Sequence, residues 1–139
     1  MRILKVIIVL SLVLHGCKSN LVCKSNKDYF VKVNESKPYN VKSEYCIHKS
    51  EQSQEGKSTI KLNLFDRINQ KVITEAVIWL NNKEKVNYSI TNNEIAIEEG
   101  DYDIDVVTPN NLPLKIKGLS VSQNQIIEIN GYLGNSLQF

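Results

Sequence analysis

Few side chains in this chain could perform catalysis. Two histidines occur, His15 and His48, and His15 falls in an apolar N-terminal segment. Nucleophilic catalysis needs a base beside a serine or cysteine, and no nucleophile motif surrounds His48. The six glycines are scattered and form no phosphate-binding loop. We therefore expect a protein that is not an enzyme, with no cofactor and no identified small-molecule substrate. A small hydrolase, the alternative, would need His48 or paired carboxylates to converge in a cleft.

The densest group of possible metal ligands is an acidic run: Glu98, Glu99, Asp101, Asp103 and Asp105. A calcium loop between two helices needs glycine at its sixth position and glutamate at its twelfth. Val106 and Leu112 stand there instead. On a strand the three aspartates would share one face, while Tyr102, Ile104 and Val106 would face the core. We expect a solvated strand face and no metal site, with weak calcium binding as the alternative.

Two aromatic residues, Trp79 and Tyr132, could stack on sugar rings. Trp79 lies in the continuous apolar run at residues 76–80, which is typical of a strand buried on both sides. We therefore expect Trp79 in the core. A carbohydrate-binding surface is the alternative, and it requires these aromatic side chains to be exposed.

The N-terminus has the layout of a secretory signal peptide. Arg2 and Lys5 flank a basic start, and residues 6–14 are apolar apart from Ser11. A transmembrane helix needs about 20 apolar residues, so this run is too short for a normal membrane span. We expect residues 1–16 to be removed.

The residues at the expected cleavage site carry a second signal. Leu14-His15-Gly16-Cys17 resembles the lipobox of bacterial lipoproteins, in which a small residue precedes an invariant cysteine. The resemblance implies that Cys17 becomes the acylated mature N-terminus and that the membrane is a partner. Each buried methylene contributes about 0.8 kcal/mol, and stable anchoring takes more than one chain. Lys18 replaces the aspartate that indicates inner-membrane retention, so we expect the outer membrane. A soluble secreted protein is the alternative.

Cys23 and Cys46 remain as an even pair in an exported chain. An oxidising compartment favours a disulfide between them, which would contribute about 3 kcal/mol for a loop of this size. Two free thiols are the alternative. A zinc site is not expected, because His48 is the only nearby imidazole and four ligands are lacking.

The formal charge of +2 comes from Arg2 and Lys5. Residues 17–139 hold 15 basic and 15 acidic side chains, so no basic field for nucleic acid is expected. Residues 17–57 are net basic, and next to an anchor they would be attracted to anionic head groups. Lysines that solvate a spacer explain the same composition.

Short strands must position all of these residues. Alternating apolar residues predict strands near residues 60–64, 76–80, 86–90, 95–97, 102–106, 114–116 and 127–129. Turn residues separate them, including Asn92-Asn93, where we expect a tight turn with positive φ. Residues 41–48 are a further possible strand, residues 18–27 look like a tether, and residues 49–58, which lack apolar residues, predict a loop or linker.

These signals predict an all-β protein, an antiparallel β-sandwich of about seven strands. A chain of 139 residues fits one domain with appendages. We expect a signal peptide at residues 1–16, a tether and short N-terminal extension with the possible disulfide at 17–57, and the sandwich at 58–139.

Residues 59–133 resemble the carboxypeptidase regulatory-like domain, an Ig-like, transthyretin-like β-sandwich. The resemblance rests on a first strand ending at Asp66, a polar turn, the Ala76-Val77 strand, and Gly100 before Tyr102 at the start of an inward-facing strand. That family has no catalytic residues of its own and usually serves as a structural or adhesive module.

Together, the lipobox and the domain resemblance imply a membrane-anchored lipoprotein of the bacterial cell envelope. It would act as a non-catalytic structural or protein-interaction module, with other envelope proteins as partners. A carbohydrate- or calcium-binding surface module is the alternative.

Overall fold

The computed structural model describes residues 20–24, 42–52 and 55–135. The expected signal peptide at residues 1–16 and Cys17 lie outside the described residues. Within the described ranges the chain forms nine strands and no helix. In chain order they are β1 (Asn20–Lys24), β2 (Glu44–Glu51), β3 (Ser58–Asp66), β4 (Glu75–Leu80), β5 (Glu84–Ser89), β6 (Glu94–Ile97), β7 (Gly100–Val107), β8 (Leu114–Val121) and β9 (Gln125–Leu133).

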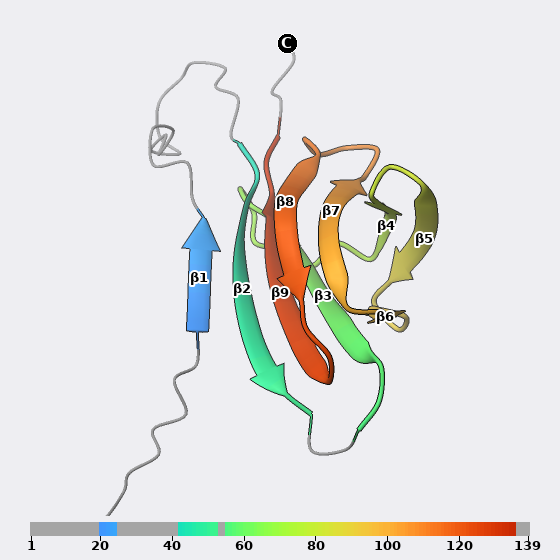
Figure 1. Cartoon of the computed structure of the whole chain (residues 1–139). Helices are drawn as coiled ribbons and strands as arrows, with labels where there is room; N and C mark the ends of the chain where they lie inside the picture. Colours follow the sequence, from blue (N-terminus) through green and yellow to red (C-terminus); the bar gives the residue numbers. More distant parts are fainter. Residues whose placement is uncertain (1–19, 25–41, 53–54, 136–139) are drawn as a thin grey trace, which may run out of the picture.

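The strands form two sheets that pack as a β-sandwich (Figure 1). One sheet has five strands in the order β1-β2-β9-β3-β6, and the other has four in the order β5-β4-β7-β8. The predicted all-β sandwich is confirmed, and β3 to β9 match the seven strands expected after residue 58. One pairing differs from the antiparallel expectation, because β3 and β9 run parallel. The chain between them passes through the second sheet, so no tight turn imposes opposite directions.

The core lies between the sheets and follows the period-two alternation of the strands. The five-stranded sheet contributes Ile60, Leu62, Leu64, Ile127, Ile129 and Leu133, all fully buried. The four-stranded sheet contributes Ile78, Ile104, Val106, Leu114 and Ile116.

The two sheets approach closely at Gly131 on β9. A Cβ atom there would lie 2.7 Å from Cδ2 of Leu114 and 2.9 Å from Cδ2 of Leu64. Both distances are well inside ordinary carbon–carbon contact. Any side chain at this position would force Leu114 or Leu64 to shift, so glycine fits the core here best.

The apolar run on β4 is not buried on both sides. Ala76, Ile78 and Leu80 face the core, whereas Val77 and Trp79 lie on the outer side and are partly exposed. The prediction that Trp79 belongs to the core is therefore wrong. The physical reason is that the four-stranded sheet packs on the other sheet with one face only, so alternate residues face outward whatever their polarity.

The N-terminal extension contributes to the five-stranded sheet. β2 pairs antiparallel with β9, and β1 pairs with β2 at the edge of the sheet. β1 occupies residues for which the sequence indicated a tether, and five residues are too few to show a clear period. β2 extends to Glu51, into the segment without apolar residues, because its backbone hydrogen bonds to β9 do not depend on side-chain polarity.

The turn expected at Asn92-Asn93 forms, but in a different way. Asn92 bonds back to Ser89 through the backbone, and positive φ angles occur at Asn81 and Asn82 in the β4–β5 turn instead. The chain changes sheets after β5, because β6 pairs with β3. The segment is therefore a crossover between sheets, which does not need the twist of a tight hairpin.

Candidate functional site

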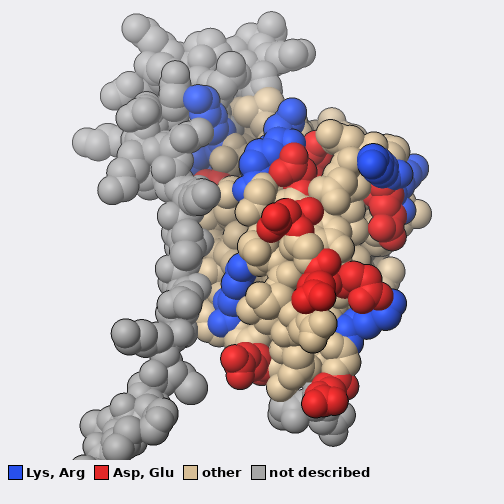
Figure 2. Space-filling model, in the orientation of Figure 1, with Lys and Arg blue, Asp and Glu red and all other residues tan. Residues whose placement is uncertain are grey.

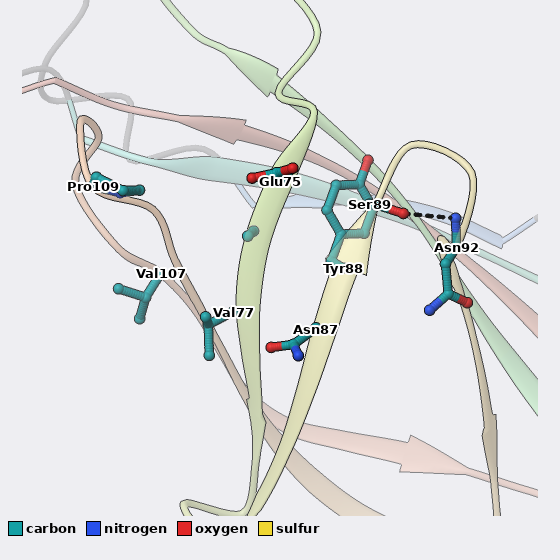
Figure 3. Close-up of a pocket in the computed structure, with 9 residues that line it drawn as sticks. Glu75, Val77, Asn87, Tyr88, Ser89, Asn92, Val107 and Pro109 are labelled. Carbon is teal, nitrogen blue, oxygen red and sulfur yellow. Dashed lines mark hydrogen bonds between the residues drawn. The ribbon is translucent and has the colours of Figure 1, made fainter.

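A depression of about 420 Å³ lies on the outer surface of the four-stranded sheet; we call it the β4 groove (Figure 3). Val77 forms its middle, with Asn87 of β5 directly opposite on one side and Val107 of β7 on the other. Pro109, just after β7, borders one side, and Glu75 lies at the end where β4 begins. Outward-facing positions of three neighbouring strands thus form most of the groove, and the core-facing residues Ala76 and Tyr88 complete its lining.

The β4 groove combines apolar and polar groups. Val107 is 42% exposed, an unusual degree for a large apolar side chain in this protein. Asn87 is exposed and offers both amide donors and an acceptor. Ser89 and Asn92 close one end, where the Asn92 backbone N–H donates to Ser89 Oγ at 3.1 Å. Among the residues lining the groove, Glu75 alone is charged.

Trp79 lies on the same face, one step further along β4 than Val77. Lys85 of β5 and Asp105 of β7 are directly opposite it. One carboxylate oxygen of Asp105, Oδ1, is buried and has no hydrogen-bond partner among the described residues. The aromatic ring of Trp79, the apolar side chains of Val77 and Val107, and neighbouring polar side chains therefore lie on one face of the sheet.

The carboxylate of Asp66 holds the loop that carries Pro109 in place. Asp66 Oδ1 accepts the backbone N–H groups of Ile68 at 2.8 Å and Asn69 at 3.1 Å. Asp66 Oδ2 accepts the side-chain amides of Asn111 at 3.0 Å and Asn135 at 3.1 Å. One carboxylate thus ties together the end of β3, the β7–β8 loop and the segment after β9.

The protonation of Asp66 reflects these bonds. Burial would raise the pKa of its carboxyl, but the donors from Asn69, Asn135, Asn111 and Ile68 outweigh burial, so the pKa lies below the ordinary 3.8. Asn111 also accepts the Thr108 hydroxyl at 3.0 Å. Asp66 and Asn111 therefore position the loop that brings Pro109 to the β4 groove, although neither residue lines the groove.

Asp101, Asp103 and Asp105 of the acidic run alternate along β7 with the residues predicted to face the core, of which Ile104 and Val106 are buried and Tyr102 is partly buried. Asp103 is engaged in a β-bulge, because Lys117 and Gly118 of β8 together stand opposite it. The Asp103 carboxylate accepts the Gly118 N–H at 2.9 Å and the Lys117 ammonium at 3.1 Å. Both bonds lower the pKa of Asp103, and the bond from Gly118 has the larger effect. Within the described part of the chain, no three His, Cys, Asp or Glu residues gather as a metal site.

His48 and Tyr132 lie on the outer face of the other sheet. His48 stands opposite Glu128 of β9, and Glu128 stands opposite Lys61 of β3. Tyr132 stacks on Phe65, with ring centroids 5.5 Å apart. The structure therefore does not bring Tyr132 together with Trp79, and His48 lies on the sheet that does not carry the β4 groove.

Cys23 of β1 and Cys46 of β2 are directly opposite each other in the strand register. Cys17, the expected lipidation site, is outside the described residues. Within those residues, no helix is long and apolar enough to cross a bilayer. On the face shown in Figure 2, acidic and basic side chains are interspersed rather than segregated.

Sequence reasoning found Trp79 but missed the groove residues Val77, Asn87, Val107 and Pro109. The sequence does contain a pattern that indicates this face. In a strand, alternate residues point the same way, so Glu75, Val77 and Trp79 share one face. Comparisons with protein-family models, curated proteins and solved structures found no match to this chain.

Proposed function

We propose that this chain is a membrane-anchored lipoprotein of the bacterial envelope that acts as a non-catalytic structural or protein-interaction module. The observation that carries the proposal is the position of β1, which begins at Asn20, three residues after Cys17. Three residues span at most about 11 Å. Acyl chains on Cys17 would therefore hold the edge of the sandwich at the membrane surface.

The strand registers define which end of the sandwich would face the membrane. Asn20 stands opposite Lys49, whose ammonium group donates to the Ser120 carbonyl near the end of β8. That end also holds Gly100, opposite Val121, whereas Val107 lies seven residues further along β7. Seven residues of strand span about 23 Å. The β4 groove would thus lie at the membrane-distal end, accessible to a partner.

A disulfide between Cys23 and Cys46 is part of the proposal. Directly opposite residues in antiparallel strands have Cα atoms about 4.5–5.5 Å apart, within the range of about 4.4–6.8 Å that disulfides span. The direct opposition of Cys23 and Cys46 in the register of β1 and β2 supports this pairing. The bond would join the anchored strand covalently to β2, so a force on the anchor would not peel β1 from the sheet.

Membership of the carboxypeptidase regulatory-like family stays a proposal as well. It is supported by the sandwich after residue 58 and by Asp66, which ends β3 and caps the following polar turn. A structural or adhesive role with other envelope proteins as partners is the function this resemblance favours.

Metabolic labelling with a clickable fatty acid, followed by separation of inner and outer membranes, tests the proposal. Wild type and Cys23→Ser should both carry the label in the outer-membrane fraction, and Cys17→Ser should carry none. Crosslinking of the labelled wild type in the envelope would then identify the partner. A wild-type protein that is exported without label contradicts the anchor and makes this a soluble secreted sandwich.

A further inference from the structure

We infer that the β4 groove binds a neutral saccharide, with Trp79 at one end of the site. This inference goes beyond the proposed function, because an anchored module could act through any surface and the anchoring experiment names no ligand. It rests on the shape of the groove, the charge of its lining, the position of Trp79 and the protection of the sheet edges.

The size and composition of the groove suit a small polar ligand. Its volume of about 420 Å³ falls in the range of about 300–1,000 Å³ that small-molecule sites occupy. A protein partner needs about 800 Å² of surface on each side, and Val107 is the only strongly exposed large apolar residue lining this depression. A ligand that uses apolar contacts and hydrogen bonds together fits these features better than a protein surface.

The charge of the lining selects among polar ligands. Glu75 is the one charged residue that lines the groove, and beside Trp79 the opposite charges of Lys85 and Asp105 offset each other. Phosphates, uronic acids and other anions would therefore gain no counter-charge there and would be repelled by Glu75. Asn87, Ser89 and Glu75 supply the donors and acceptors that sugar hydroxyl groups use, beside the apolar surface of Val77 and Val107.

Trp79 lies beyond the residues that line the groove and is partly exposed, so its indole ring would extend the site along β4. Val77 and Trp79 face the same side of β4, and residues two apart on a strand are separated by about 6.6 Å. The electron-rich face of an indole ring attracts the weakly positive C–H groups of a sugar ring. A saccharide lying along β4 would therefore contact Val77 and Trp79 in succession.

The edges of the four-stranded sheet argue against an added peptide strand as the occupant. On edge strand β8, Lys115 and Lys117 point outward and the bulge at Gly118 interrupts the ladder. The other edge strand, β5, carries the exposed charges of Glu84 and Lys85. Edge charges and bulges are the features that prevent strand addition. The open face, rather than an edge, is the available binding surface.

The fluorescence of Trp79 provides a direct test, because it is the only tryptophan in the chain. The full-length protein, in a detergent without a sugar head group, is titrated separately with cellohexaose, maltohexaose, xylohexaose and N-acetylated chitohexaose. Hexagalacturonic acid is the anionic comparison. We expect a saturable change in emission with at least one neutral hexasaccharide and none with the acid, and calorimetry should give the same affinity.

Variants locate the site. Asn87→Ala and Glu75→Gln should each weaken binding about tenfold, equivalent to about 1.4 kcal/mol. Glu84→Gln is the matched control, because it makes the same change on the same sheet outside the groove, and it should bind as wild type does. Trp79→Phe, measured by calorimetry, should bind more weakly while keeping the circular dichroism of wild type.

Three results would overturn the inference: no response to any neutral saccharide at millimolar concentration, equal binding by Asn87→Ala and wild type, or tighter binding of the acid. None of them bears on the anchor, because fatty-acid labelling of Cys17 is scored independently. If the chain is labelled but binds no saccharide, the proposed function stands and the saccharide inference is refuted.

Discussion

Substituting alanine for Gly131 adds one methyl group where the two sheets meet. The new Cβ would lie 2.7 Å from Leu114 Cδ2 and 2.9 Å from Leu64 Cδ2, whereas carbon atoms in contact sit about 3.5–4.0 Å apart. Both leucines are buried, so neither can relieve the overlap by turning toward solvent. Overpacking of this kind costs about 1–3 kcal/mol.

A smaller effect opposes this cost. Alanine restricts the unfolded chain more than glycine does, which favours folding by about 0.4–1 kcal/mol where the backbone is compatible. We therefore expect Gly131→Ala to lower the free energy of unfolding by about 1–2 kcal/mol. For a domain of this size each kcal/mol lowers Tm by about 4–8 °C.

Urea unfolding followed by circular dichroism measures the change. Gly56→Ala is the matched control, because Gly56 is exposed and its nearest neighbouring atom would lie 3.8 Å from the added methyl group. Leu114→Val removes the atom in closest conflict, so it should cost less stability in the Gly131→Ala background than in wild type. An unfolding midpoint for Gly131→Ala equal to that of Gly56→Ala would refute the reasoning.

Three further predictions concern other parts of the fold. Gly118→Ala should destabilise by about 1–2 kcal/mol in urea unfolding, because Gly118 has φ of 63° in the bulge; an unchanged midpoint would contradict this. The folded-state pKa of Asp66 lies below 3.8, so its stabilisation is complete above the unfolded pKa and lost as the pH falls below about 4. Asp66→Asn should therefore be less stable at neutral pH and less acid-sensitive; parallel pH profiles for the two proteins would exclude this role. Cys23→Ser and Cys46→Ser should each cost about 3 kcal/mol, and a reductant should abolish the difference from wild type; a difference that persists in reductant would point to packing instead.

The sequence was most informative where apolar residues alternate. Ile60, Leu62 and Leu64 predicted a strand with one buried face, and all three are fully buried. The sequence did not predict the direction of β9 relative to β3, because apolar alternation is the same in parallel and antiparallel strands.

The candidate site was the harder prediction. Trp79 was assigned to the core because a continuous apolar run does not reveal how many faces of a sheet are covered. The sequence did not single out Asn87, because an exposed asparagine on a strand is common. Its place in the groove follows only from its pairing opposite Val77. Pairing between strands is tertiary information, and one sequence does not specify it.

The position of β9 sets the order in which the sandwich can assemble. β9 lies between β2 and β3, and within the described strands β2 has only β1 as its other neighbour. A chain that emerges from a ribosome or a translocation channel therefore cannot complete the five-stranded sheet until Leu133 has emerged. Until then β2 exposes one unpaired edge and β3 lacks a partner on one side. Contacts so distant in sequence slow folding, so we expect the nascent chain to depend on a holding chaperone until Leu133 has emerged.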